Sequence, residues 1–438
     1  MPHADILAAV RAERSTLISM AQRLIAVPSP NPPLATGAVA GVAAELVRQH
    51  IPGADLSLHE AGDGVVNLVA RLEGHAPGRR VVLSGHLDTY PVNEALPWTV
   101  VPLGGLVRDG RIYGRGAADM KGGIAASILA MAVLARHRAD WRGEVVLALS
   151  GDEESMGALG AEWLLQNVPC VRGDAVIIGD AGSPAVVRFG EKGFLWVEVE
   201  AVGKPAHGAH VHLGVNAIDR LRVALDALSS LRDMPIHAPD SVTQAIAVAR
   251  PVSEALSGAG EARTLGHVTV NIGHIAGGTS MNLIPASARA GVDIRLPVGV
   301  PASAIEARVA AILGGMEGLS WRVLRRIEPS FTPPDSELVR TVAGVAHEVL
   351  GHHPVVNMRV GGSDSRVFRH AGIPTVVYGP TPFNMGGADE YALVDELVTV
   401  AAVHALSAIR MTNPAAGAKM VRGTSGADGS STLDTRRA

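Results

Sequence analysis

The sequence is short of the features that mark several large classes of protein. It has one cysteine, Cys170, among 438 residues, so no disulfide can form within the chain and a disulfide-stapled scaffold is excluded. Lys and Arg number 38 against 42 Asp and Glu, and no basic run indicates a nucleic acid or an anionic membrane as partner. No stretch reaches the roughly 18–20 uninterrupted apolar residues of a membrane-spanning helix. We therefore expect a cytoplasmic protein with neither a nucleic acid nor a membrane as partner.

What the chain does have is ample apolar material for folding. Hydrophobic residues make up 47% and charged residues 18%, although aromatic residues are only 3%. This balance is typical of a globular protein. A chain of 438 residues exceeds what one hydrophobic core normally serves, so about two domains are expected. The last residues, 412–438, are rich in Gly, Ala, Ser and Thr, and they predict a disordered tail.

Short apolar runs alternate with helical segments over the first 188 residues. The runs at 65–72, 81–85, 144–150 and 175–179 are nearly continuous in apolar residues. Such runs are typical of strands buried on both faces of a parallel sheet. We therefore predict an α/β fold with a mixed, largely parallel sheet that carries helices on both faces. In sheets of this kind, ligands bind at the carboxyl ends of the strands.

The pattern changes after residue 188. Strands at 193–202, 267–276 and 288–296, and a helix at 216–231 that a polar linker follows, predict a small α+β unit inserted into the larger domain. The expected division is the first part of the larger domain at 1–188, the inserted unit at 189–299 and the second part of the larger domain at 300–411.

Polar residues stand where the predicted strands end. His86 and Asp88 lie two positions apart, so they share a face if the strand continues. An imidazole supplies a nitrogen ligand for a metal, and a nearby carboxylate orients it. His-x-Asp alone is equally typical of an ordinary polar strand end. The recurrence of acids at the ends of the later strands, Glu153, Glu154 and Asp180, is what indicates a metal site.

Asp119 lies in the Gly-rich segment 114–123, directly before a predicted helix at 124–138. A carboxylate has two oxygens and can bridge two cations, as in two-metal hydrolases. The segment could instead be a plain turn or an anion cradle. Strand alternation would turn the side chains of Glu153 and Glu154 apart, so that one binds metal and the other acts as a general base.

In this order, the motifs SGHLDT, GRGAADMKGG and SGDEE, and then an acid after an apolar strand, resemble those of the zinc-dependent aminoacylase family. That family includes acetylornithine deacetylase, succinyl-diaminopimelate desuccinylase and glutamate carboxypeptidase, and the resemblance covers about residues 15–410. It implies a hydrolase that cleaves the amide bond of a small N-acyl amino acid. A dipeptidase or carboxypeptidase is the alternative on the same scaffold. The implied cofactor is Zn²⁺, one or two ions per subunit, with Co²⁺ or Mn²⁺ as alternative ions.

The resemblance also implies a role for each residue of the constellation. His86 and Asp180 bind the first metal, Glu154 binds the second, and Asp119 bridges the two. Glu153 is the implied general base, and the implied role of Asp88 is to orient His86.

The inserted unit resembles the dimerisation lid of the same family, which implies a homodimer. The implied role of His207 is to polarise the scissile carbonyl, in its own subunit or across the dimer. Asn282 and Arg295 match lid residues that contact the substrate, and an Arg fork suits a carboxylate. Gly362 and Ser363 match a loop near that carboxylate.

One position departs from the family pattern. The family has a metal-binding His three residues before the Asp of an Asp-Glu-Tyr segment, and this chain has Gly386 before Asp389. The second metal would keep Asp119 and Glu154 unless Asp389, water or the substrate replaces the imidazole. Two hypotheses follow: the chain uses a single catalytic ion, or the free room admits a different substrate group. A catalytically silent binding protein is the alternative from another class.

Overall fold

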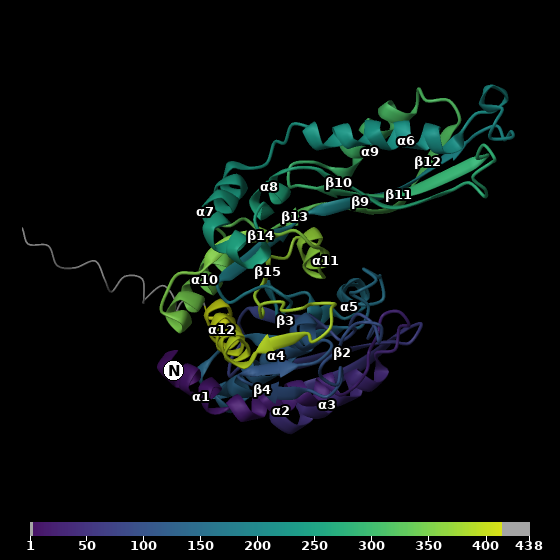
Figure 1. Ribbon diagram of the computed structural model, residues 1–438. Coiled ribbons are helices and arrows are strands. Elements are labelled where there is room, and N and C mark those ends of the chain that lie inside the picture. The colour runs from purple at the N-terminus through teal and green to yellow at the C-terminus, as the bar shows by residue number, and fades with distance from the viewer. Residues whose placement is uncertain (1–2, 414–438) are drawn as a thin grey trace, which may run out of the picture.

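Two sheets of different size organise the chain, and Figure 1 shows the smaller one standing above the larger. In this computed structural model, which describes residues 3–413, the larger sheet has nine strands in the order β1-β2-β6-β3-β7-β15-β8-β13, with β14 also paired to β8. These strands are β1 (Asp55–Gly62), β2 (Val65–Glu73), β3 (Arg80–His86), β6 (Glu144–Ser150), β7 (Ala175–Ile178), β8 (Val186–Glu191), β13 (Ser330–Phe331), β14 (Val355–Arg359) and β15 (Thr375–Val377).

The pairing in this sheet is mixed. Strands β6, β3, β7 and β15 run parallel at its centre, and β14 is parallel to β8. The pairs β1–β2, β2–β6, β15–β8 and β8–β13 are antiparallel. Val81, Val82 and Leu83 of β3 are all fully buried, as expected of a strand covered on both faces. The predicted α/β fold with a mixed sheet is confirmed, and its longest parallel run is confined to the four central strands.

Helices cover both faces of the larger sheet (Figure 1). On one side, α3 (Gly37–His50), α4 (Gly122–Arg136) and α12 (Val394–Thr412) pack together with α1 (His3–Ala12), α2 (Arg14–Ile25) and α10 (Glu337–Leu350). On the other side lie α5 (Ala161–Asn167), against β6, and α11 (Ser365–His370), against β15. The segment Ala117–Arg136, which contains α4, is long and apolar enough to cross a membrane, but all of its apolar window is buried inside the protein.

The N-terminus of α4 approaches the end of β7 so closely that only glycine fits there. A Cβ on Gly123 would lie 1.8 Å from the backbone oxygen of Gly179. A real Cβ cannot come this close, so any other residue would push the helix away from the sheet. This contact brings the segment that carries Asp119 next to Asp180, which follows β7.

The smaller sheet is entirely antiparallel, in the order β10-β11-β9-β12. Its strands are β9 (Gly193–Val202), β10 (Thr269–Gly277), β11 (Ser287–Leu296) and β12 (Leu319–Ile327), and its helices are α6 (Ala217–Leu228) and α9 (Ala302–Leu313). Both helices pack on this sheet, and their apolar side chains share with it a hydrophobic cluster separate from that of the larger sheet. An exposed edge strand, β10, ends this sheet on one side.

The packing bears on the expected boundary between residues 299 and 300. That boundary assigns α9 and β12 to the larger domain. However, Ile305, Val309 and Leu313 of α9 lie in the smaller hydrophobic cluster, and β12 pairs with β9. We therefore propose that the inserted unit continues to the end of β12 and that the larger domain resumes after it.

The prediction of a polar linker after residue 231 is wrong. The segment instead forms α7 (Asp240–Ser257) and α8 (Glu261–Gly266). The buried Arg188 of β8 holds both helices, because its Nη1 donates to Ser253 Oγ at 3.2 Å and to Glu261 Oε1 at 3.2 Å. The proline at position 251 interrupts the local helical pattern, and the contacts that stabilise the segment come from residues distant in the sequence.

A third, small sheet lies next to the segment that carries Asp119. It pairs β16 (Tyr391–Leu393) with β5 (Arg111–Tyr113) and β5 with β4 (Leu106–Arg108). This pairing carries Glu390 to the segment before α4. The chain then enters α12, which ends at Thr412, and from residue 414 on the tail predicted at 412–438 lies outside the described residues.

Candidate metal and catalytic site

Two strand ends and one loop bring a group of buried ligand atoms together. One ligand atom each of His86, Asp119 and Asp180 lie within 4.8 Å of one another. The Nε2 atom of His86 is 3.0 Å from Oδ1 of Asp119 and 4.0 Å from Oδ1 of Asp180. Within residues 3–413, this is the one group of three or more His, Cys, Asp or Glu ligands that is close enough to hold a metal ion.

Asp88 connects His86 with the acids that follow β6. The Nδ1 atom of His86 lies 2.9 Å from the backbone oxygen of Asp88, which fixes the imidazole with Nε2 toward the other ligands. The Asp88 carboxylate accepts hydrogen bonds from the backbone N–H groups of Glu153 at 3.2 Å and Glu154 at 3.0 Å, and from Asn31 Nδ2 at 2.8 Å. Asp88 is therefore placed to orient both the imidazole and the Glu153-Glu154 segment.

Glu153 and Glu154 do not continue the strand, as the alternation argument assumed. Strand β6 ends at Ser150, and both residues lie in the turn that follows. Glu153 is buried with only 7% of its surface exposed. Glu154 is partly buried, and its Oε1 accepts a hydrogen bond from the backbone N–H of Tyr90 at 3.1 Å. The two side chains thus occupy different surroundings for a reason that the strand pattern did not contain.

Asp119 is held in place by the backbone around it. The N–H groups of Ala118 and Asp119 donate to Oε1 of Glu390 at 3.0 Å and 3.2 Å. The other carboxylate oxygen of Glu390 pairs with Nη1 of Arg115 at 2.5 Å, and both side chains are buried. Glu390 therefore positions the loop that presents the Asp119 carboxylate.

Several carboxyl groups are buried close together around His86, and their pKa values show that their ionised forms lack enough nearby positive charge. Burial raises the pKa values of Asp119 and Glu153, the latter to well above its ordinary value. Burial and the nearby Asp119 raise the pKa of Glu154 to about 10. Burial alone would lower the pKa of His86, but hydrogen bonds to Asp119 and Asp88 raise it well above its ordinary value.

One nitrogen and several oxygen donors, brought together away from water, fit a hard or borderline divalent cation. The charge of such a cation would favour the ionised carboxylates that burial disfavours. The residues of the first site thus fit a metal ion.

Sequence reasoning missed Arg359, the last residue of β14. Its Nη1 donates to Oδ2 of Asp180, and the guanidinium is the reason why the pKa of Asp180 is lowered although burial alone would raise it. Asp364 was missed as well; it is buried, and its carboxylate accepts a hydrogen bond from Ser150 Oγ at 2.5 Å. Both residues lie within two positions of the Gly361-Gly362-Ser363 turn. Charged residues beside a turn already assigned to the site were the pattern that could have identified them.

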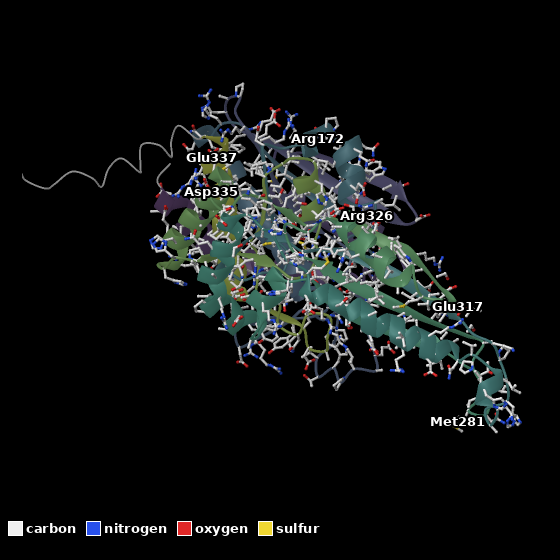
Figure 2. All side chains as sticks on the ribbon, turned by 90° about the horizontal axis from the view of Figure 1, so that it is seen from above. Arg172, Met281, Glu317, Arg326, Asp335 and Glu337 are labelled. Atoms are coloured by element: carbon white, nitrogen blue, oxygen red, sulfur yellow. The ribbon has the colours of Figure 1, made fainter. Side chains whose placement is uncertain are left out.

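The structure does not bring the predicted lid residues to the metal ligands. His207 and Asn282 lie together on the exposed tip of the inserted unit, where the Gly208 N–H donates to the Asn282 backbone oxygen at 2.7 Å. Figure 2 shows Met281, the neighbour of Asn282, at one extremity of the molecule. Arg295 lies on β11, where its Nε donates to Oδ2 of Asp293 at 2.9 Å.

The loop predicted to lie near the substrate carboxylate is partly committed to other contacts. Ser363 is fully buried, and its Oγ donates to Oε2 of Glu191 at 2.7 Å. Gly362 is partly exposed, and a Cβ built on it would meet the Met156 side chain at 2.9 Å. Between these two residues, only the backbone of Gly362 is open to a ligand.

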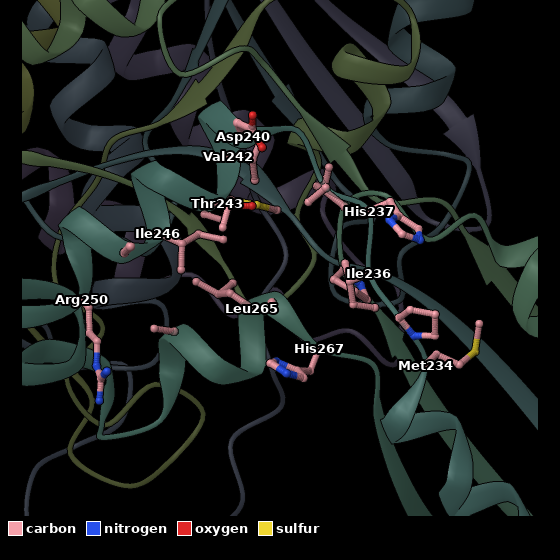
Figure 3. Close-up of a pocket in the computed structure, with 18 residues that line it drawn as sticks. Met234, Ile236, His237, Asp240, Val242, Thr243, Ile246, Arg250, Leu265 and His267 are labelled. Carbon is pink, nitrogen blue, oxygen red and sulfur yellow. The ribbon is translucent and has the colours of Figure 1, made fainter.

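A cavity of about 970 Å³ lies elsewhere, among α7, α8 and the segments that lead into and out of the smaller sheet. Its lining includes Met358 and four residues that Figure 3 shows gathered around it, Ile236, Val242, Ile246 and Leu265. None of the residues of the metal group lines this cavity. The candidate catalytic site is therefore identified by its converging ligand atoms, and this cavity is not part of it.

Comparisons with known proteins agree with this geometry. The sequence profile of the peptidase family M20/M25/M40 matches residues 82–410. A succinyl-diaminopimelate desuccinylase of Rhodospirillum centenum is 30% identical over 402 residues, which cover 88% of this chain and 95% of that protein. Another from Cereibacter sphaeroides is 31% identical over 384 residues, 84% of this chain and 92% of that protein.

Solved structures share the fold. An M20 family metallo-carboxypeptidase of Sulfolobus solfataricus superposes with a TM-score of 0.75 at 21% identity, over 91% of this chain and 99% of that one. A dinuclear metal-binding M20 peptidase of Bacillus subtilis superposes with a TM-score of 0.64 at 16% identity, over 92% of this chain and 99% of that one.

Proposed function

Because the chain belongs to the peptidase family M20/M25/M40 and is a metal-dependent amide hydrolase, we propose that it cleaves the amide bond of an N-acyl amino acid. The observation that carries this proposal is the buried group of His86, Asp119 and Asp180 with Glu153 beside it. Relatives that align over most of the chain are named succinyl-diaminopimelate desuccinylases, which supports an N-acyl substrate. The intact metal and base residues speak against a catalytically silent binding protein.

We propose Zn²⁺ as the resident ion, with Co²⁺ and Mn²⁺ as alternatives, and His86, Asp119 and Asp180 as its ligands. A divalent cation in this site would act as a Lewis acid toward the scissile carbonyl and would acidify a water molecule. Asp88 fixes the Nδ1 side of the imidazole, so Nε2 remains available as a ligand.

Glu153 is the proposed general base. Its carboxylate takes a proton from the attacking water and then gives that proton to the leaving amine nitrogen, as a general acid. Burial raises the pKa of Glu153, which makes the carboxylate a stronger base than an exposed glutamate. Arg295 and the backbone at Gly362 are proposed to bind the substrate carboxylate.

We further propose that the protein is a cytoplasmic homodimer that joins through the inserted unit. His207 and Asn282 stand on the exposed tip of that unit, and Arg295 also belongs to it. The exposed edge strand β10 also carries Ile272 and Ile275, whose side chains are 38% and 58% exposed, as apolar surface for a partner. In a two-fold dimer, the tip of one subunit can reach the site of the other, where His207 would polarise the scissile carbonyl.

Mixing two inactive variants tests whether His207 acts across the dimer. Glu153→Gln loses the base and His207→Ala loses the polarising imidazole. After dissociation and reassociation of an equal mixture, heterodimers would have one intact site out of two, and about a quarter of the wild-type activity should return. Each variant reassociated alone is the control. If the mixture stays inactive although native mass spectrometry shows heterodimers, His207 does not act across the dimer.

A substrate panel tests the proposed reaction. The wild-type protein, loaded with Zn²⁺, Co²⁺ or Mn²⁺, is offered N-succinyl and N-acetyl amino acids and unmodified dipeptides, and amine release is measured. We expect kcat/KM for the best N-acyl amino acid to exceed that for any dipeptide by at least about tenfold, a difference of roughly 1.4 kcal/mol in transition-state binding. Faster cleavage of a dipeptide would assign the chain to the dipeptidase alternative instead.

A further inference from the structure

The second metal position contains fewer ligands than the first. The family pattern assigns Asp119, Glu154 and a histidine to it, and this chain has Gly386 where that histidine would stand. Three protein ligands are the usual number for a catalytic zinc ion, so two carboxylates alone make a weak site. Whether a second ion binds therefore depends on what else can reach this position.

The two acids nearest to Gly386 in the sequence are committed elsewhere. The Asp389 carboxylate accepts hydrogen bonds from the Thr99 N–H at 2.8 Å and the Thr99 hydroxyl at 2.6 Å. Glu390 accepts from two backbone N–H groups and pairs with the buried Arg115. Asp389 is therefore not available as a substitute ligand, although the sequence left that alternative open.

The backbone at Gly386 also disfavours a ligand there. Its φ angle is +74°, in the left-handed region that favours glycine. Its carbonyl oxygen accepts a hydrogen bond from Nη2 of Arg115 at 2.9 Å, which ties this conformation to the buried Arg115–Glu390 pair. A histidine at this position would adopt a conformation that costs about 1 kcal/mol or more.

The Tyr90 ring faces Gly386. A Cβ built on Gly386 would lie 3.7 Å from Cδ2 and 4.0 Å from Cε2 of Tyr90, and apart from the two chain neighbours no other atom of the described residues comes within 4 Å of it. Tyr90 is also tied to the second-site carboxylate, because its backbone N–H donates to Oε1 of Glu154. The tyrosine ring thus lies within contact distance of the first carbon of any side chain on residue 386.

We propose that this chain binds one catalytic metal ion per subunit, and that the Tyr90 ring occupies the room that a second-site imidazole would need. Tyr90 and Gly386 are neighbours in the fold: a Cβ on residue 386 would already touch the ring at 3.7 Å, so a longer side chain would have to share that space with the ring. The inference rests on the proposed metal group of His86, Asp119 and Asp180.

Metal content tests this inference without any activity assay. The full-length protein and its variants are incubated with excess ZnCl₂, passed into metal-free buffer, and analysed by elemental mass spectrometry together with protein concentration. We expect one zinc ion per chain for the wild type and for Gly386→His alone, because Tyr90 still faces the new imidazole. The double variant Tyr90→Val with Gly386→His should bind two, and Tyr90→Val alone is the matched control that should keep one.

The outcomes separate this inference from the proposed function. Two zinc ions in the wild type would overturn the one-metal inference and leave the hydrolase proposal standing. No zinc in the wild type would overturn the proposed first site itself. If the wild type binds two ions and Tyr90→Phe binds one, the phenol oxygen is a ligand and Tyr90 does not merely fill space. Titration with Co²⁺, followed by its visible absorption, gives the same count for variants that are recovered in small amounts, with an end point expected at one equivalent.

Discussion

Replacing Glu153 by glutamine is expected to lower kcat by about 1,000-fold or more while the metal content of the protein stays unchanged. Glutamine has nearly the same shape as glutamate but cannot take a proton from water. Glu153 is buried beside the metal group and does not belong to the three ligands that converge there, so its loss should remove proton transfer only. Initial rates on the best substrate of the panel and elemental analysis of the same samples give the two measurements.

The matched control for this variant is Glu162→Gln on α5. Glu162 is exposed, so this change removes the same charge from the same kind of residue without touching the site. We expect wild-type rates from it. If Glu153→Gln retains more than about a tenth of the wild-type kcat, Glu153 is not the general base. If the variant instead loses its metal, Glu153 is a ligand and the base must be sought elsewhere.

The sequence predicted the site as far as local pattern and strand order allow. Apolar runs of strand length predict buried parallel strands, and the carboxyl ends of such strands meet at one edge of a sheet. His86 and Asp180 are far apart in the chain but follow strands that end at this edge, and the structure brings their side chains to 4.0 Å. Their proximity follows from the type and direction of the two strands, which the local sequence encodes.

What the sequence did not predict depends on contacts between distant segments. Arg359 meets Asp180 across a separation of 179 residues, and Glu390 meets the backbone of Asp119 across 271. Neither pairing follows from periodicity, because each requires the register of strands that join late in the chain. The same holds for α9 and β12, whose partner strand β9 precedes them by more than a hundred residues.

Local pattern also misled where a functional loop replaces regular structure. The strand alternation invoked for Glu153 and Glu154 does not apply, because β6 ends at Ser150 and a turn follows. The Asp88 carboxylate accepts hydrogen bonds from the N–H groups of both glutamates and so fixes the turn. The side chains differ because the backbone N–H of Tyr90 donates to the Glu154 carboxylate. These contacts come from the segment after β3, and no pattern within residues 150–156 could have shown them.

Removing the metal ion is expected to abolish activity and to lower the apparent Tm by roughly 3–5 °C, as loss of a tightly bound ligand does in a protein of this size. The loss of stability should be larger at pH 8 than at pH 5.5. In the metal-free protein, the folded state holds protons on Glu154, whose pKa is about 10, and on Asp119 and Glu153, whose pKa values are also raised. The unfolded chain releases the proton of Asp119 near pH 3.8 and those of the two glutamates near pH 4.5, so the metal-free fold loses stability as pH rises from these values toward 10.

His86 acts in the same direction, because its raised pKa favours the protonated fold below its unfolded value of 6.5, and that contribution disappears as pH rises through the folded pKa. Asp180 acts in the opposite direction, since its lowered pKa gives stability above the unfolded value of 3.8, but this is already present at both test pH values. A bound cation favours the deprotonated ligands, so metal stabilises the fold more at the higher pH.

Thermal melts of chelated and zinc-loaded protein at pH 5.5 and pH 8 give the four Tm values needed. His86→Ala, which lacks one ligand, should show little shift on adding zinc at either pH. An equal shift for this variant and the wild type would mean that the stabilising ion binds outside the group of His86, Asp119 and Asp180.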